Sequence, residues 1–192
     1  MSMRLRSALV IALQVIALFG MIGIKQWTLS TGTPVLLETA PVDPRSLFSG
    51  DYVRLSYTIS NLRLDTLAGD KDFKRRDDVY VVLQQDTPYA KAISAHHAMP
   101  PVSTGQVVIR GEVQYASDSV WNQQTRKMEP AKNLSVRYGI ENYYVPEGTG
   151  HALERPSGKE KVSVRVAVDR YGKAGILAIL VNGEARYAES LL

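Results

Sequence analysis

One segment of the chain concentrates side chains that could move protons. It contains, in order, Tyr138, Glu141, Glu147, His151 and Glu154. A carboxylate beside a second titratable group can act as an acid–base pair on a bound substrate, provided that the groups converge in a concavity. We therefore name these five residues as a candidate binding site, with Glu147 and either His151 or Glu154 as the acid–base pair. The alternative is that the tyrosines pack in the core and the acids are solvated.

Two adjacent histidines, His96 and His97, raise the question of a metal site, with His151 as a third ligand. Neighbouring residues on a strand point to opposite faces, so the pair could chelate one ion only from a turn. The sequence AMPP at residues 98–101 does indicate a loop there. No carboxylate stands at a spacing typical of ligands, and we predict neither a metal site nor a cofactor.

The sequence GDYVRLSY is the most distinctive short pattern in the chain. Its fixed positions are Gly50, Asp51, Tyr52, Leu55 and Tyr57. The glycine can take a positive φ in a turn, and the aspartate can accept hydrogen bonds from backbone N–H groups of that turn. A strand beginning at the first tyrosine then places the leucine and the second tyrosine on one face. We interpret the motif as structural, with a ligand site at the aspartate as the alternative.

This pattern fits G-D-Y-x-x-L-x-Y, and the chain resembles the GDYXXLXY family of bacterial membrane-anchored proteins. A second segment, RYGIENYYVPEGTGHALE at residues 137–154, is similar to the YGIE…FVPEG region of that family. Together with the N-terminal helix, the resemblance covers most of the chain. It implies a membrane location and no established activity.

A weaker resemblance concerns signal peptidases and related Ser–Lys proteases, which also carry Gly-Asp at the start of a strand. Their nucleophilic serine lies eight residues before the glycine, where this chain has Val42. Ser46 and Ser49 stand in the wrong register, although a lysine base could arrive from elsewhere in the fold. We therefore assign no catalytic residue.

The elements that must position these residues begin with a membrane helix. Residues 7–24 form an apolar run in which Gln14 is the only strongly polar side chain. As a helix this run is about 27 Å long, enough to cross the hydrocarbon core of a bilayer. It is longer than the apolar region of a signal peptide, and the sequence KQW at 25–27 is a poor exit from a cleavage site. Arg4 and Arg6 predict a cytoplasmic N-terminus, and we expect an uncleaved signal anchor.

One face of this helix carries small residues, which are Ala8, Ala12, Gly20 and Gly23. Small residues allow a second helix to approach closely. The alternative is that alanine and glycine are simply common in membrane helices.

Beyond the anchor, apolar residues alternate with polar ones, which is typical of half-buried strands. Four segments show this alternation, at residues 51–60, 107–115, 134–140 and 162–168. Asn182-Gly183 between apolar segments predicts a hairpin, whereas the mixed charges of residues 61–78 indicate a solvated helix or excursion. We predict a mostly β fold with antiparallel sheets, arranged as a sandwich or partly open barrel, and one N-terminal transmembrane α-helix.

The expected organisation has three parts: a tail and anchor at 1–27, a linker at 28–33 and an extracytoplasmic β domain at 34–192. The 192 residues include no cysteine, which excludes disulfides and thiolate chemistry. The net charge is +4, but basic residues are scattered among acids, and we expect no nucleic-acid partner.

These observations favour a non-enzymatic, membrane-tethered β domain that binds or organises another envelope protein. We expect it in the bacterial inner membrane, in contact with lipid through residues 7–24. Two alternatives remain at the level of the sequence. One is a hydrolase with a site near residues 141–154, and the other is a small-molecule or lipid-binding β domain.

Overall fold

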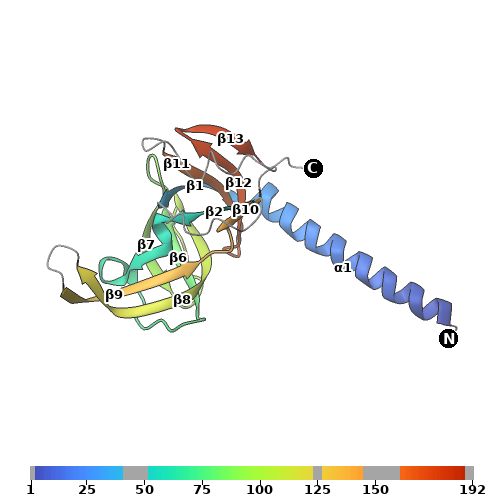
Figure 1. Cartoon of the computed structure of the whole chain (residues 1–192), viewed down its shortest axis with the longest axis horizontal. Helices are drawn as coiled ribbons and strands as arrows, with labels where there is room; N and C mark the ends of the chain where they lie inside the picture. The colour runs from blue at the N-terminus through green and yellow to red at the C-terminus, as the bar shows by residue number, and fades with distance from the viewer. Residues whose placement is uncertain (1–2, 41–51, 123–126, 145–160, 189–192) are drawn as a thin grey trace.

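The computed structural model consists of a long N-terminal helix joined to a β domain (Figure 1). The structure describes residues 3–40, 52–122, 127–144 and 161–188. Within these ranges the predicted fold class is confirmed, because the domain is mostly β and nearly all strand pairs are antiparallel.

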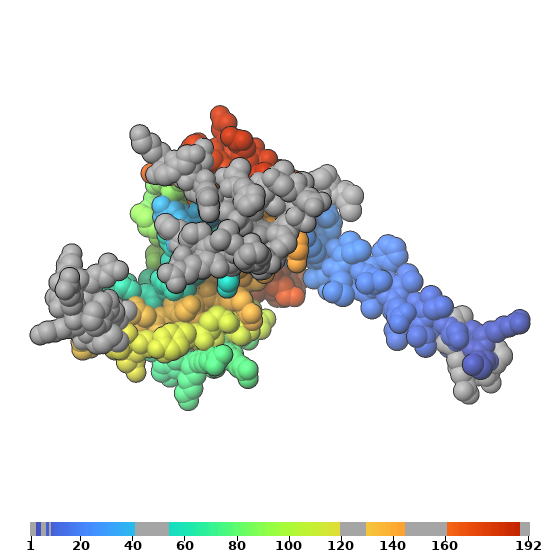
Figure 2. Space-filling model, in the orientation of Figure 1, coloured from blue at the N-terminus to red at the C-terminus, as the bar shows by residue number. Residues whose placement is uncertain are grey.

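The helix α1 runs from Met3 to Thr31 and projects away from the domain as an isolated rod (Figure 2). Its segment Leu9–Thr31 has a mean hydropathy of 1.9 and is long and apolar enough to span a membrane. Large apolar side chains along it are exposed, with Phe19 and Met21 each 70% accessible. A surface of this kind is suited to lipid and not to water.

The end of α1 lies where the sequence indicates a linker, at residues 28–33. The helix continues to Thr31, and the first strand begins two residues later at Thr33. Thr28 and Leu29 are only 6% and 7% exposed because they pack against the β domain. Tertiary burial therefore outweighs the local turn signal of the Ser, Thr and Gly residues.

Five antiparallel strands form the sheet next to α1, in the spatial order β13-β12-β11-β1-β3. Their bounds in that order are Glu184–Ala188, Ala174–Val181, Val162–Val168, Thr33–Ala40 and Ser56–Tyr57. The strands β11, β12 and β13 form an antiparallel meander, and the predicted hairpin at Asn182-Gly183 joins the last two. This turn has positive φ at both Asn182 (54°) and Gly183 (88°), as an Asn-Gly hairpin requires.

A second sheet has six strands in the order β4-β9-β8-β6-β7-β5, of which only the β5–β7 pair is parallel. Their bounds are Asn61–Arg63, Lys127–Arg137, Gln106–Asn122, Asp78–Gln84, Lys91–His96 and Ala68–Gly69. The strands β8 and β9 form a ribbon at the end of the molecule opposite α1 (Figure 1). A register shift between Val113 and Tyr115 leaves Tyr115 63% exposed, although the alternation assigns it to the apolar face.

The predicted strand at residues 51–60 is divided in the structure. β2 (Tyr52–Arg54) pairs with β10 (Asn142–Tyr144), whereas β3 pairs with β1. A 3-10 turn, η1 (Thr58–Ser60), follows β3, and a second, η2 (Leu64–Thr66), follows β4. The chain thus changes sheets within the segment, which the simple alternation does not reveal.

One hydrophobic core joins the sheets, and Tyr57 is among its fully buried side chains. The charged excursion at residues 61–78 also contributes to this core through Leu62, Leu64 and Phe73, which are 4%, 2% and 6% exposed. The charges of that segment face solvent while its apolar residues close one side of the domain.

Candidate functional site

The two sequence motifs meet in space, although their interacting residues lie 79 and 83 positions apart in the sequence. β2 pairs antiparallel with β10, and the backbone N–H of Leu55 donates to the carbonyl of Glu141 at 2.7 Å. We call the contacts between residues 52–60 and 138–144 the motif interface. One side of the interface follows β9 of the six-stranded sheet. The other side includes β3, which belongs to the five-stranded sheet.

Two buried tyrosines connect the motif segments reciprocally. The hydroxyl of Tyr57 donates to the carbonyl of Ile140 at 2.5 Å, and the hydroxyl of Tyr138 donates to the carbonyl of Ile59 at 2.7 Å. The two side chains are 0% and 6% exposed. Each motif therefore supplies the donor for a carbonyl of the other, and neither phenol is left without a partner in the core.

Burial raises the pKa of Tyr57 and of Tyr138 well above the ordinary value for tyrosine, and the negative charge of Glu141 raises both further. Both phenols are consequently neutral at physiological pH. They act as hydrogen-bond donors that hold the fold and not as proton acceptors.

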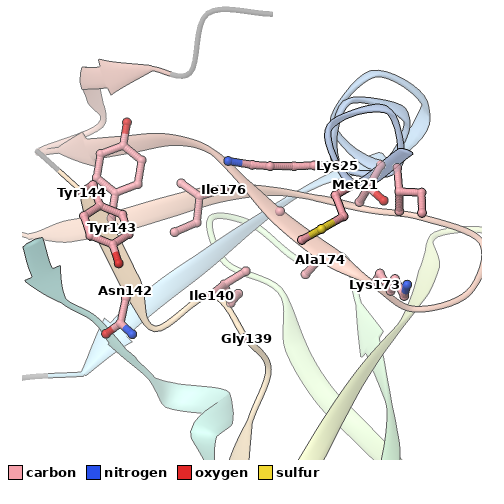
Figure 3. A pocket seen from close by; sticks show the side chains of 13 residues that line it. Met21, Lys25, Gly139, Ile140, Asn142, Tyr143, Tyr144, Lys173, Ala174 and Ile176 are labelled. Atoms are coloured by element: carbon pink, nitrogen blue, oxygen red, sulfur yellow. The ribbon is translucent and has the colours of Figure 1, made fainter. Parts of the chain in front are cut away.

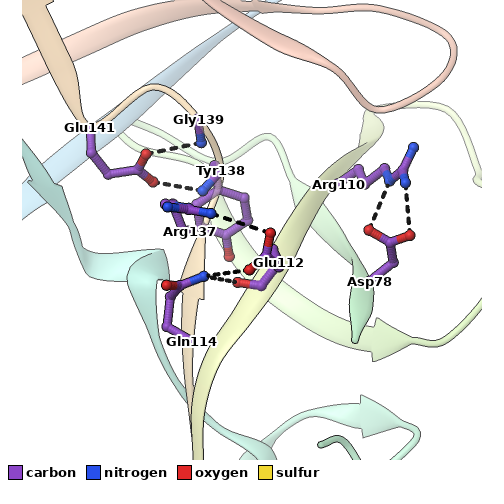
Figure 4. A network of polar contacts seen from close by, with 8 residues as sticks. All are labelled: Asp78, Arg110, Glu112, Gln114, Arg137, Tyr138, Gly139 and Glu141. Atoms are coloured by element: carbon purple, nitrogen blue, oxygen red, sulfur yellow. Dashed lines mark hydrogen bonds and ion pairs between the residues drawn. The ribbon is translucent and has the colours of Figure 1, made fainter. Parts of the chain in front are cut away.

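Glu141 closes the turn between β9 and β10 (Figure 4). Its two carboxylate oxygens accept hydrogen bonds from the backbone N–H groups of Tyr138, at 2.6 Å, and Gly139, at 2.9 Å. Gly139 has φ of 81°, a conformation that favours glycine. The carboxylate predicted for a binding site is thus engaged in local structure.

Ion pairs flank this turn on β8 and its neighbours (Figure 4). Arg137 binds Glu112 at 3.2 Å, and Arg110 binds Asp78 at 2.7 Å. The four side chains are between 43% and 56% exposed, so solvent screens these pairs and each contributes little to stability. The hydrogen bonds that Arg110 donates to Asp78 raise the pKa of Arg110, which stays charged.

The remaining predicted site residues divide between described and undescribed parts of the chain. Leu55 is buried beside Tyr57, as the structural interpretation of the motif requires, and Tyr52 begins β2. Outside the described residues lie Gly50, Asp51, Glu147, His151 and Glu154. The predicted acid–base pair therefore stays a prediction.

The two adjacent histidines have separate environments. The Nε2 atom of His96 lies 2.9 Å from the hydroxyl of Ser94, while that of His97 lies 3.1 Å from a carboxylate oxygen of Asp72. The ring of His97 also stacks on Phe73 at 4.2 Å. The hydrogen bond from His97 lowers the pKa of Asp72. Among the described residues, no group of three His, Asp or Glu side chains is arranged to hold a metal ion.

A protein-family model matches most of the chain. The GDYXXLXY protein family matches residues 14–179. The chain belongs to the GDYXXLXY family. Neither the curated proteins nor the solved structures gave a match to it. The match includes both motif segments, so the motif interface is built from residues within the family's own range.

The segment that follows Tyr138 in this GDYXXLXY protein has a second face, which lines a groove of about 460 Å³ between α1 and the β domain (Figure 3). We call it the helix–domain groove. α1 contributes one wall, the β9–β10 turn and β10 a second, and the start of β12 a third. The lining residues are Met21, Ile24, Lys25, Thr28, Gly139, Ile140, Asn142, Tyr143, Tyr144, Lys173, Ala174, Gly175 and Ile176.

The groove has an apolar base and a basic rim. Ile140 and Ile176 are 3% and 8% exposed and form part of the base. Lys25 and Lys173 are exposed at the rim, and neither ammonium group has a carboxylate partner within the described part of the chain. Tyr144 is 79% exposed.

Asp169 holds the wall formed by the β11–β12 turn against α1. It accepts a hydrogen bond from the hydroxyl of Thr28 at 2.8 Å. Its other oxygen accepts from the backbone N–H groups of Tyr171 and Lys173, at 2.9 and 3.0 Å. The carboxylate is therefore committed to positioning the turn and the helix.

Sequence reasoning missed the groove. Lys25 directly follows the apolar run at residues 7–24, but nothing in the local sequence connects it with Lys173. Only the docking of α1 onto the β11–β12 hairpin brings them to one site.

Proposed function

We propose that this protein is a non-enzymatic, membrane-tethered β domain that binds another envelope protein. In this proposal α1 is an uncleaved signal anchor that crosses the bacterial inner membrane once. Arg4 and Arg6 support a cytoplasmic N-terminus, which leaves the β domain in the periplasm.

The observation that supports this function best is the rigid junction between α1 and the domain. A Cβ atom added at Gly32 would lie 2.6 Å from the carbonyl oxygen of Thr28 and 2.9 Å from the Cβ of Ala167. A Cβ at Gly175 would lie 2.7 Å from a methyl carbon of Leu29. The junction has no room for further side chains at these two positions, which favours one orientation of the domain relative to its anchor. A fixed orientation lowers the entropic cost of binding a neighbour in the same membrane.

The anchor also offers a face for such a neighbour. Nothing lies within 4 Å of a Cβ added at Gly20 or Gly23. At about 100° per residue, these glycines and Ala12 point nearly opposite to Thr28 and Leu29, which contact the domain. A partner helix can approach closely on this face without meeting the β domain.

Cross-linking in intact membranes tests this proposal. Gly20→Leu and Gly23→Leu should reduce recovery of the cross-linked partner several-fold, because both add bulk at the close approach without adding polarity. Val15→Leu and Ile22→Leu, on another face, serve as matched controls. Equal effects at all four positions, or no effect at any, would contradict a dedicated binding face.

The membrane topology has its own test. A reporter that is active only outside the cytoplasm, fused after Leu192, should be active, and the mature chain should retain Ser2. Recovery of a soluble protein that begins near Ser30 would show that the apolar segment is a cleaved signal peptide.

A further inference from the structure

The helix–domain groove lies where a bilayer changes from hydrocarbon to headgroups. Met21 and Ile24 belong to the end of the apolar run and are 70% and 59% exposed. Lys25 follows directly, and the exposed Trp27 stands in the position of an interfacial aromatic anchor. With α1 across the membrane, the groove opens at the headgroup level of the leaflet beside the domain.

The groove is lined by both apolar and basic residues. Met21 and Ile24 line the groove from α1, about one turn or less before Lys25 in the sequence. The two cations come from different elements, Lys25 from α1 and Lys173 from the turn before β12 (Figure 3). The carboxylate of Asp169 accepts hydrogen bonds from Thr28 and from backbone N–H groups. Among the described residues, no ion pair joins it to Lys25 or Lys173. An occupant that matches this surface combines an apolar chain with a negative charge at its polar end.

The groove is also formed in advance. Its β10 wall is fixed by the motif interface, where Tyr57 holds Ile140 and Glu141 closes the turn. Its helix wall is fixed by the hydrogen bond between Thr28 and Asp169. Preformed walls reduce the conformational cost of binding.

We propose that the helix–domain groove binds one anionic phospholipid from the leaflet beside the β domain. The acyl chain lies along Met21 and Ile24, and the phosphate lies at the rim, where Lys25 and Lys173 supply positive charge. The exposed Tyr144 sits at the headgroup level, where amphipathic aromatic side chains are favoured. The family motif then has a definite task, which is to hold one wall of a lipid site. This inference uses the groove face of α1 and is independent of the small-residue face, although both rest on α1 crossing the membrane.

Lipid retention by the full-length protein tests the proposal. The protein is reconstituted in vesicles of equal parts phosphatidylcholine and phosphatidylglycerol, extracted with mild detergent, and analysed by native mass spectrometry. We expect one retained phosphatidylglycerol, preferred about thirtyfold over phosphatidylcholine, because each of the two lysines near an anionic headgroup contributes about 1 kcal/mol. The double variant Lys25→Gln/Lys173→Gln should reduce that preference to about twofold or less.

A charge-matched control distinguishes a specific lipid site from general attraction between exposed cations and anionic lipid. Lys74→Gln/Arg75→Gln removes two exposed cations elsewhere on the domain and should leave the preference unchanged. Ala174→Phe fills the groove and should abolish retention of either lipid. The melting temperature of each variant establishes that it is folded.

Three results overturn the proposal. They are equal retention of the two lipids by the parent, an equal loss of preference in the control pair, and full retention by a folded Ala174→Phe protein. Loss of partner cross-linking with intact lipid retention, or the reverse, distinguishes failure of this proposal from failure of the proposed function.

Discussion

The motif interface and the helix–domain groove share one short segment, residues 138–144. They differ in whether their polar side chains have partners within the protein. In the interface, the hydroxyls of Tyr57 and Tyr138 and the carboxylate of Glu141 each have protein partners. In the groove, Lys25 and Lys173 have no carboxylate partner in the described part of the chain. The most recognisable residues thus maintain the fold, while the groups available to a ligand lie outside the motif.

This difference predicts that substitutions in the interface change stability, whereas substitutions in the groove change binding alone. The predictions below test that separation in the full-length protein in detergent micelles.

Truncation of the buried tyrosine should have the largest effect. Tyr57→Ala removes a fully buried aromatic side chain, and we expect the free energy of unfolding to fall by about 3–5 kcal/mol. Tyr144→Ala, at the exposed edge of the groove, should change it by less than about 0.5 kcal/mol. Denaturant unfolding measures both. Similar losses in the two variants would contradict the prediction that the interface, and not the groove, determines stability.

Alkaline pH should destabilise the protein through the same two phenols. Their pKa is raised in the folded state, whereas the unfolded chain has tyrosine near its ordinary value of about 10. Above about pH 10 the unfolded state binds fewer protons than the native state, so stability falls as pH rises. At pH 11 the loss should be about 1 kcal/mol per tyrosine. The double variant Tyr57→Phe/Tyr138→Phe should lose less stability between pH 9 and 11 than the parent.

Removal of single hydroxyls should have a smaller effect at neutral pH. Tyr57→Phe and Tyr138→Phe each leave a buried carbonyl without its donor, and each should cost about 1–2 kcal/mol. A double-mutant cycle should give a coupling energy of about 0.5 kcal/mol or more, because the two bonds hold the same pair of segments. Tyr115→Phe, at an exposed position, is the control. Strict additivity would mean that the two tyrosines act independently.

The groove lysines should have the smallest effect on stability. Lys25→Gln/Lys173→Gln removes two solvated charges and should shift the free energy of unfolding by less than about 0.5 kcal/mol. A loss comparable with that of the tyrosine variants would place these lysines in the folding of the junction and not in binding.

Much of the fold follows from local patterns in the sequence. The apolar run predicts α1, the alternation at 162–168 predicts β11, and Asn182-Gly183 predicts its hairpin turn, because each signal acts over a few residues. The change of sheet near Leu55 and the outward turn of Tyr115 depend on long-range pairing and a bulge, which periodicity does not encode. The continuation of α1 past Thr28 to Thr31 depends on burial against strands far along the chain.

The candidate site was predictable only in part, for the same reason. Tyr57, Tyr138 and Glu141 stand in recognisable motifs and could be named from the sequence. Their reciprocal bonds could not, because the two segments are joined by the register between β2 and β10. The basic rim of the groove consists of Lys25 and Lys173, which come close only because α1 packs against β11 and β12.

The absence of a flexible joint between α1 and β1 also has a mechanical consequence. Membrane helices change their tilt when the thickness of the surrounding bilayer changes. Here the helix enters the sheet through a packed junction at Gly32. If α1 crosses the bilayer as we propose, a change in its tilt would turn the domain with it. The β8–β9 ribbon lies at the end of the molecule opposite α1 (Figure 1), so a change in bilayer thickness would move these strands furthest.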